Sequence, residues 1–300
     1  MAKIEFENIS KSYDGVKVLD GLSGVIEDGK VVSLIGRNGI GKTTLLEILI
    51  GLRKPDVGTV KLDGIDLHED PEKARQKVAF VSETCNIYSW MTSKHLESFL
   101  KPLYNNWSSE LYQSYLDKFA IPKNKSIGDM SKGSKHKLML ASAIAIQPEI
   151  MILDEPLSGF DPVIRDEVLE TLIDKLCESG VTIIISSHQI DDIEKISDHA
   201  FMLIDGKFKI NSSIEEIDNS IQKVVVKLEE AMGAMPTDED ILSSISSGKE
   251  LELIVQNYSK ENVSRVLSGL KVKSVSSEHI SLREILVKLT KSEKQTRMDN

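Results

Sequence analysis

Three short and nearly uninterrupted apolar runs, at residues 31–35, 150–153 and 181–185, predict buried strands. A helix-like stretch at 162–177 separates the second run from the third. Apolar strands that are joined by helices are typical of a parallel sheet covered on both faces. The pattern therefore predicts an α/β fold with a mostly parallel sheet at its core.

Two other stretches show different periods. The first 70 residues read as short strands broken by turns, and we expect a hairpin turn at Asp28-Gly29 and a second turn pair at Asp63-Gly64. Between residues 93 and 147, large apolar side chains recur at three- and four-residue steps. This spacing predicts a mostly helical insertion.

The pattern of apolar and polar residues changes again after residue 208. We expect loops or helix ends at 231–236 and in the serine-rich stretch 243–247, and a frayed tail after residue 291. The other predicted elements are strands at 224–228 and 251–255 and helices at 260–267 and 280–289. The chain is therefore expected to form a large domain (1–212), with a helical subdomain at about 84–147, and an accessory α+β domain (213–300).

Composition narrows the possible classes of protein. The 300 residues carry 47 acidic and 37 basic side chains, a formal charge of -10, which argues against a nucleic-acid binder. Cys85 and Cys177 are too few for a disulfide scaffold, so we expect packed, reduced thiols in a cytosolic protein. No run of about 20 apolar residues and no secretion signal is present, so any membrane role is expected to come from a partner.

A phosphate-binding motif follows the first apolar run. Gly36-Arg37-Asn38-Gly39-Ile40-Gly41-Lys42-Thr43 fits G-x-x-x-x-G-K-[ST], and a buried helix is predicted at 43–50. In such a loop the backbone N–H groups surround phosphates, the lysine reaches the β- and γ-phosphates and the Thr hydroxyl faces Mg²⁺. The nucleotide-binding candidates here are Gly36, Asn38, Gly39, Gly41, Lys42, Thr43 and Thr44. The alternative is an ordinary glycine turn.

Two carboxylates end the second apolar run. Asp154, delivered beside the phosphate loop, would hold Mg²⁺ through water, and Glu155 would polarise an attacking water. Acidic residues at strand ends are common, so the pair indicates a catalytic site only because a phosphate loop is present in the same chain.

Further segments complete a set that resembles the ATP-binding cassette (ABC) ATPases. They are Met130-Ser131-Lys132-Gly133-Ser134, Ser158-Gly159-Phe160-Asp161 and His188. In that family the Walker A, Q-loop, signature, Walker B, D-loop and H-loop motifs follow in this order, and residues 1 to about 212 match it. The resemblance implies a P-loop NTPase with a mostly parallel sheet core, an antiparallel β subdomain and a helical subdomain, followed here by a small C-terminal α+β domain.

The resemblance also implies roles for individual residues. Tyr13 would stack on adenine, or else pack under a hairpin. His188 would contact the γ-phosphate, and Asp161 would communicate between sites or serve only as a helix cap. Ser131 and Gly133 would complete the phosphate site of a second subunit.

Two motifs depart from the family pattern. Met130, Lys132 and Ser134 replace the usual signature residues, and Lys132 either adds charge near the nucleotide or is solvated. Glu83 stands where the Q-loop usually has glutamine, and we expect it to join Thr43 and Asp154 as a Mg²⁺ ligand.

The resemblance implies the ATP-binding and hydrolysing subunit of a transporter, with Lys42, Glu155 and His188 as catalytic residues and ATP and Mg²⁺ as cofactors. It would energise translocation, in the direction of export, through a separate integral membrane permease on the inner face of the cell membrane. A second copy would complete a homodimer. The departures and the appended domain are similar to bacterial export-type cassettes, the Ytr-like subgroup among them.

Alternatives stay open at this point. One is a soluble ABC ATPase without a transport role, for example in iron–sulfur assembly. The aromatic residues at 84–91, with Tyr104 and Trp107, would dock the permease or pack internally, and exposure of Trp90 separates the two. The C-terminal domain would regulate, stabilise a dimer or be a structural appendage.

Overall fold

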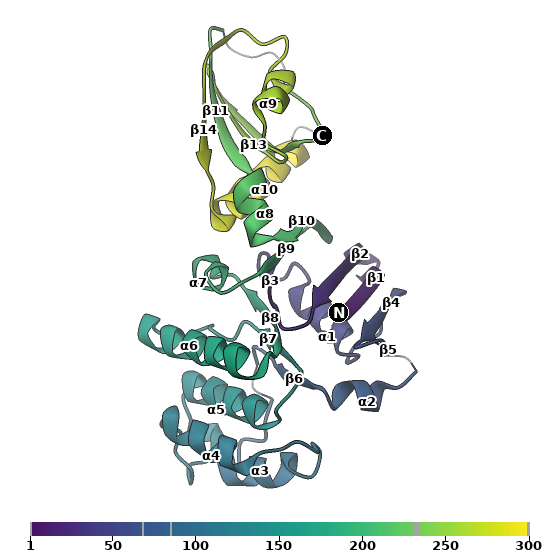
Figure 1. The fold of residues 1–300 in the computed structure, drawn as a ribbon, viewed down its shortest axis with the longest axis vertical. Helices are drawn as coiled ribbons and strands as arrows, with labels where there is room; N and C mark the ends of the chain where they lie inside the picture. Colours follow the sequence, from purple (N-terminus) through teal and green to yellow (C-terminus); the bar gives the residue numbers. More distant parts are fainter. Residues whose placement is uncertain (1, 68, 85, 231–234, 299–300) are drawn as a thin grey trace. The chain divides into compact units, whose positions relative to one another are not determined.

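A computed structural model describes all residues except 1, 68, 85, 231–234 and 299–300, and the side chains of residues 2, 176–177 and 292–298 are also outside the description. The expectations for the thiols of Cys85 and Cys177 and for part of the loop 231–236 fall outside it. The chain divides into two compact units, Met1–Phe208 and Lys209–Asn300, each described by itself below (Figure 1).

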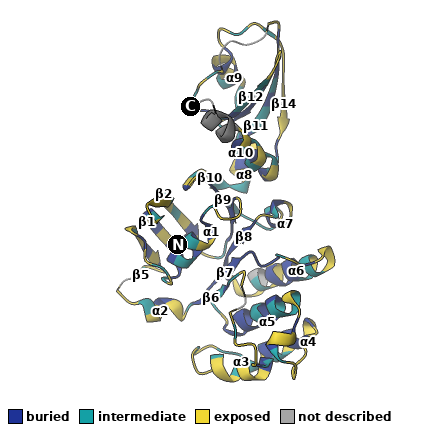
Figure 2. Ribbon diagram, turned by 180° about the vertical axis from the view of Figure 1, so that it is seen from behind, coloured by how far each residue is buried: buried dark blue, intermediate teal, exposed yellow. Residues whose placement is uncertain are grey.

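A six-stranded sheet forms the centre of the first unit. Its order is β10-β9-β3-β8-β7-β6, and β10 is the strand on which the chain passes into the second unit. The strands are β3 (Val31–Ile35), β6 (Val78–Val81), β7 (Ile150–Asp154), β8 (Thr182–Ser187), β9 (His199–Ile204) and β10 (Lys207–Ser213). β3, β7 and β8 run parallel and are buried at every residue, which confirms the prediction from the three apolar runs (Figure 2).

Helices cover this sheet. They are α1 (Lys42–Leu49), α2 (Pro71–Arg75), α6 (Pro162–Ser179) and α7 (Ile190–Glu194). The first, predicted at 43–50, packs its apolar face into the core that the parallel sheet shares with a second sheet. The first residue of this helix, Lys42, thereby lies beyond the carboxyl end of β3.

The second sheet is antiparallel, in the order β2-β1-β4-β5. Its strands are β1 (Ala2–Tyr13), β2 (Val16–Glu27), β4 (Val57–Leu62) and β5 (Ile65–Asp66). The turn at Asp63-Gly64 joins β4 and β5, as expected. The hairpin predicted at Asp28-Gly29 is wrong, because β2 and β3 belong to different sheets; the hairpin lies at Asp14-Gly15, where Tyr13 pairs with Val16.

The predicted helical insertion is confirmed. It contains α3 (Ser93–Leu100), α4 (Ser109–Lys118), the short 3₁₀ helix η1 (Ile127–Asp129) and α5 (Lys132–Ala145). In Figures 1 and 2 these helices group at the end of the first unit that is remote from β1 and β2. The buried Tyr112 ties the group together through a hydrogen bond from its hydroxyl to the Ser93 carbonyl (2.9 Å).

The described residues of the second unit form a four-stranded sheet in the order β12-β13-β11-β14 and three helices. Its elements are α8 (Ile214–Ser220), β11 (Gln222–Leu228), β12 (Ile241–Ser247), β13 (Glu250–Val255), α9 (Lys260–Val266), β14 (Val272–His279) and α10 (Leu282–Met298). The loop predicted at 243–247 is wrong, since these serines pair with β13. The helix predicted at 280–289 continues to Met298, so the frayed tail after residue 291 is also wrong.

No helix in the described part of the chain has both the length and the apolar character needed to span a membrane.

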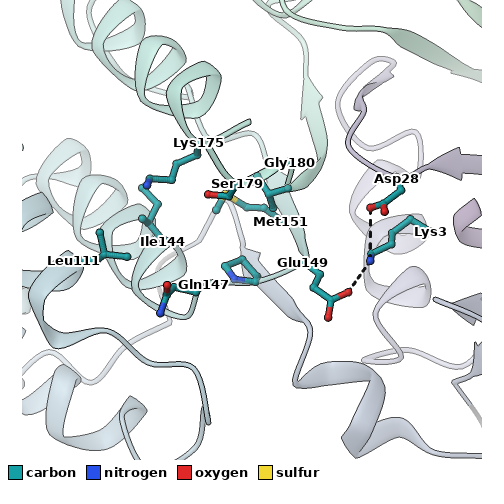
Figure 3. A pocket seen from close by; sticks show the side chains of 12 residues that line it. Lys3, Asp28, Leu111, Ile144, Gln147, Glu149, Met151, Lys175, Ser179 and Gly180 are labelled. Atoms are coloured by element: carbon teal, nitrogen blue, oxygen red, sulfur yellow. Dashed lines mark hydrogen bonds and ion pairs between the residues drawn. The ribbon is translucent and has the colours of Figure 1, made fainter. Parts of the chain in front are cut away.

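In the first unit, a charged cluster around Lys3 of β1 connects the antiparallel sheet to the parallel one. The Nζ atom of Lys3 lies 2.6 Å from Glu149 Oε2 and 3.6 Å from Asp28 Oδ1 (Figure 3). It also lies 3.8 Å from Asp63 Oδ1, and Lys77 pairs with both Glu149 and Asp63.

Replacing Lys3 by Met should destabilise the first unit in a pH-dependent way. The hydrogen bond from Lys3 lowers the pKa of Glu149, and the one from Lys77 lowers the pKa of Asp63. Because folding lowers both values, their stabilisation is complete above pH about 5, where both groups are also ionised in the unfolded chain, and is lost as the pH falls through the folded-state pKa values. We expect Lys3→Met to lower the free energy of unfolding by about 1 kcal/mol at pH 7, since the carboxylates are partly exposed.

Urea unfolding followed by tryptophan fluorescence tests this, because Trp90 and Trp107 both lie in the first unit. Lys61→Met, which changes an exposed lysine of β4, is the matched control. A difference between Lys3→Met and wild type that stays constant down to pH 3 would contradict the role of the two carboxylates.

Candidate functional site

The phosphate loop connects β3 to α1, and its geometry requires glycine at Gly41. This residue has φ +115°, and a Cβ atom there would lie 2.8 Å from Val18 Cγ1 and 2.9 Å from Leu19 Cδ2. A side chain is therefore excluded both by the backbone conformation and by the wall of β2. The glycine lets the chain turn into α1 with Lys42 as the first helical residue.

Lys42 is buried (6% exposed), and its ammonium group is held by oxygen atoms. Its Nζ donates to the Gly36 carbonyl (2.8 Å) and lies 3.1 Å from Glu155 Oε1. A buried charge needs such partners, because removing it from water without them is costly. The ammonium group thus lies between the phosphate loop and the end of β7.

Asp154 forms the second part of the site at the end of β7. Thr43 Oγ1 donates to its Oδ2 (2.6 Å), and Ser186 Oγ donates to its Oδ1 (2.6 Å). Ser186, at the end of β8, is a site residue that the sequence reasoning missed. The hydroxyl of Thr43 and the carboxylate of Asp154 are hard oxygen donors in contact, the kind of pair that Mg²⁺ prefers.

Glu155 and His188 form the third part. Nδ1 of His188 lies 2.6 Å from Glu155 Oε2, and the backbone N–H of His188 donates to the same oxygen (3.3 Å). The backbone N–H of Glu155 donates to Ser186 Oγ (2.9 Å). Its other carboxylate oxygen, Oε1, forms the ion pair with Lys42 but no hydrogen bond within the described residues. The carboxylate is 5% exposed and is held from two sides.

These parts border an open cavity of about 320 Å³. It is lined by Tyr13, Val18, Asn38, Gly39, Gly41, Lys42, Thr43, Thr44, Glu83 and Glu155. Eight of the predicted nucleotide or catalytic residues and the departing Glu83 are thus brought together. Val18 was not predicted, because an apolar residue in a strand carries no chemical signal.

Tyr13 lies at the end of β1, on the border of this cavity. Its ring is 36% exposed, with the Arg53 guanidinium carbon 5.4 Å and Lys11 Nζ 5.8 Å from the ring centroid. The ring is therefore not packed under the β1–β2 hairpin. The residue is partly exposed beside the cavity, and an aromatic ring is suited to stacking on a planar group.

Ser131, Gly133 and Asp161 do not line the cavity in the described chain. Ser131 is the N-cap of α5, where its Oγ accepts a hydrogen bond from the Ser134 N–H (3.1 Å). Asp161 Oδ1 accepts from the Ile164 N–H (3.1 Å) at the start of α6, which is the capping alternative considered for it.

A larger cavity of about 390 Å³ lies at the opposite ends of β7 and β8 (Figure 3). Its walls include Leu111, Ile144, Met151 and Lys175, and the Lys3–Glu149 pair closes one side. None of the phosphate-loop residues reaches it. The smaller cavity is therefore the candidate nucleotide site.

Comparison with known proteins gives one consistent result. A sequence model of the ABC transporter family matches residues 19–158. The bacitracin transport ATP-binding protein BcrA of Enterococcus faecalis is 33% identical over 240 residues, covering 76% of this chain and 78% of BcrA. The ABC transporter ATP-binding protein YtrB of Bacillus subtilis is 28% identical over 284 residues, covering 95% of this chain and 97% of YtrB.

A solved structure of an ATP-binding subunit of an ABC transporter matches with a TM-score of 0.66 at 28% identity, covering 72% of this chain and 92% of that one. These relatives are transporter subunits, which favours transport over the soluble alternative. The chain belongs to the ABC transporter family, in which it is the ATP-binding, ATP-hydrolysing subunit.

Proposed function

We propose that the 320 Å³ cavity binds ATP together with Mg²⁺ and that Glu155 is the general base for hydrolysis. The observation that carries the proposal is the arrangement around Glu155, whose carboxylate lies between Lys42 (3.1 Å) and His188 (2.6 Å) at the border of the cavity. Tyr13 lies on the same border and suits the base.

The Lys42–Glu155 pair sets the order of events. While the Lys42 ammonium group is paired with Oε1 of Glu155, that oxygen is not available to a water molecule. The γ- and β-phosphate oxygens of ATP attract the same ammonium group more strongly, because they bring several negative charges. Lys42 then turns to the phosphates, and Oε1 of Glu155 becomes free to accept a proton.

Hydrolysis follows from this arrangement. Water attacks the γ-phosphorus, its proton passes to Glu155, and the bond to the β-phosphate oxygen breaks to leave ADP and phosphate. His188 donates Nδ1–H to Oε2 and so keeps the carboxylate aimed at the water. The imidazole is half exposed and can also reach the γ-phosphate.

The donor set fits Mg²⁺. Thr43 and Asp154 would hold it, and Glu83, which lines the same cavity, would replace the neutral amide of the usual Q-loop. The described residues contain no group of three or more His, Cys, Asp or Glu placed to hold a metal, so phosphates and water would supply the remaining ligands. When bound, Mg²⁺ neutralises charge on the phosphates.

A second copy of the chain would complete the site. Ser131 and Gly133 lie at the start of α5, away from the cavity of their own chain, where the helix presents positive backbone N–H groups. One chain carries both halves, so two copies arranged head to tail would form two equal sites. We therefore propose a homodimer that closes on ATP.

The surface for the permease is proposed around Trp90. Tyr88 and Trp90 are 69% and 62% exposed, and their stacked rings have centroids 6.2 Å apart. Phe99 and Leu103 are each at least half exposed. Large exposed aromatic side chains are typical of interface hot spots. We propose that an apolar helix of the membrane subunit covers them, which would place the chain on the cytoplasmic face, and that transport runs outward.

Glu155→Gln should stop hydrolysis without preventing ATP binding. The amide still reaches His188 but takes up no proton, so we expect kcat to fall at least about 100-fold. Phosphate release and size-exclusion chromatography with MgATP measure the two effects, and the variant should elute as a dimer. Lys42→Ala is the control, because it should neither hydrolyse ATP nor elute as a dimer. Normal hydrolysis by Glu155→Gln would falsify the role of Glu155.

Glu83→Gln should retain ATP binding while changing the Mg²⁺ dependence of turnover. Removal of one negative charge beside the triphosphate should raise the Mg²⁺ concentration needed for half-maximal activity, by a few-fold. ATPase titrations with Mg²⁺ at fixed ATP test this, with Glu110→Gln in α4 as a control. An unchanged Mg²⁺ titration would remove Glu83 from the metal site.

Trp90→Ala should weaken association with the membrane subunit but leave the ATPase activity of the isolated chain unchanged. Burial of a Trp at an interface typically contributes about 2 kcal/mol or more. Tagged chains can be captured from detergent-solubilised membranes of the native cells, and a multi-span protein sought by mass spectrometry. Val25→Ala, at an exposed apolar position of β2, is the control. Equal recovery with Trp90→Ala and wild type would place the docking surface elsewhere.

A further inference from the structure

We propose that His136 is a positioning residue that joins the Glu83 segment to the D-loop, so that a displacement of one is transmitted to the other. The inference rests on the proposed ATPase function and adds a residue that neither the sequence motifs nor the comparisons assign. It begins from a buried, titratable side chain outside the nucleotide cavity.

His136 lies on α5, one turn beyond the N-cap Ser131, and is 4% exposed. Its Nε2 lies 2.8 Å from the Glu83 carbonyl oxygen. A carbonyl oxygen only accepts, so Nε2 carries the proton and Nδ1 has a lone pair. No described group donates to Nδ1, although it is buried. An unsatisfied buried acceptor costs free energy, and an apolar residue would avoid the cost. Packing alone does not explain a histidine here.

The other contact of His136 is with the D-loop. The imidazole meets the ring of Phe160 edge to face, with the centroids 5.8 Å apart at 83°. Phe160 is buried, and its ring also limits Gly133, where a Cβ atom would lie 3.1 Å from Phe160 Cε1. The ring therefore fills a slot made by α5.

The backbone beside Phe160 connects the D-loop to α6. The Phe160 carbonyl accepts from Arg165 Nε (3.1 Å), and the next residue, Asp161, caps α6. Lys132, beside the slot, adds a hydrogen bond from Nζ to Ser158 Oγ (3.4 Å). The D-loop is thus seated on the first turns of the signature helix.

The Glu83 end connects to two surfaces. Glu83 lines the nucleotide cavity, and the exposed Tyr88 and Trp90 follow within seven residues. One imidazole therefore contacts the backbone of this segment, the helix that bears the signature and the ring that precedes Asp161. Since interiors are close-packed, a shift of the Glu83 carbonyl must move His136 or break its hydrogen bond.

The test uses the full chain and compares His136→Leu, which keeps an apolar volume without a donor, with His136→Gln, which keeps an N–H donor. We expect His136→Leu to lower kcat about tenfold and to leave the KM for ATP within about twofold, since His136 does not line the proposed nucleotide cavity. His136→Gln should restore most of kcat. The melting temperature of His136→Leu should change little, because leucine removes the unsatisfied Nδ1 but also the donor to the Glu83 carbonyl.

Phe160→Leu supplies an independent arm, because it leaves the hydrogen bond to Glu83 intact and removes the ring. It too should lower kcat and spare KM, and the double variant His136→Leu/Phe160→Leu should be no worse than the poorer single one. Wild-type kcat in Phe160→Leu overturns the proposal even if His136→Leu does not fold.

Two further outcomes decide against it. Wild-type kcat in His136→Leu, or equal loss in His136→Leu and His136→Gln in proportion to a falling melting temperature, would leave only a packing role. Lys42→Ala separates this failure from that of the proposed function. Hydrolysis that persists in Lys42→Ala refutes the ATPase site itself, whereas Lys42-dependent hydrolysis that is indifferent to His136 refutes only the coupling.

Discussion

The ion pair between Lys42 and Glu155 is the interaction on which the site depends. Both side chains are almost fully buried, and each charge is offset by the other across 3.1 Å. The pair is also the reason that the phosphate loop and the end of β7 form one site, because it joins residues more than a hundred positions apart. In the proposed mechanism a triphosphate competes for the lysine, so nucleotide binding would free the carboxylate of Glu155 in the same step.

The parallel sheet makes this pair possible. In the order β3-β8-β7, the strand between the two functional ones contributes Ser186, which contacts the Asp154 carboxylate through Oγ and receives the N–H of Glu155. The carboxyl ends of parallel strands share one edge, where loops carry function and the strands themselves stay buried. The serine hydroxyl thereby links the Asp154 carboxylate to the backbone of Glu155.

The strands at 31–35, 150–153 and 181–185 were predictable because they are buried on both faces, so their composition reveals them. The phosphate loop and its neighbours were predictable because their chemistry requires particular residue types at fixed spacing. Asp14-Gly15 and Asp28-Gly29 are alike in sequence, and only the pairing of β1 with β2 decides which is the hairpin. β14 escaped prediction because its side chains are nearly all exposed, and Ser186, Val18 and His136 because their roles arise from tertiary contacts alone.

The slot around Phe160 changes how a defect in the signature should be interpreted. Gly133 is expected to face a nucleotide held by another copy of the chain, yet within its own chain it also leaves room for the Phe160 ring. An alanine at this position would enter both spaces at once. An inactive allele at Gly133 would therefore be genetically ambiguous, since the same methyl group would disturb contacts on either side of the subunit boundary.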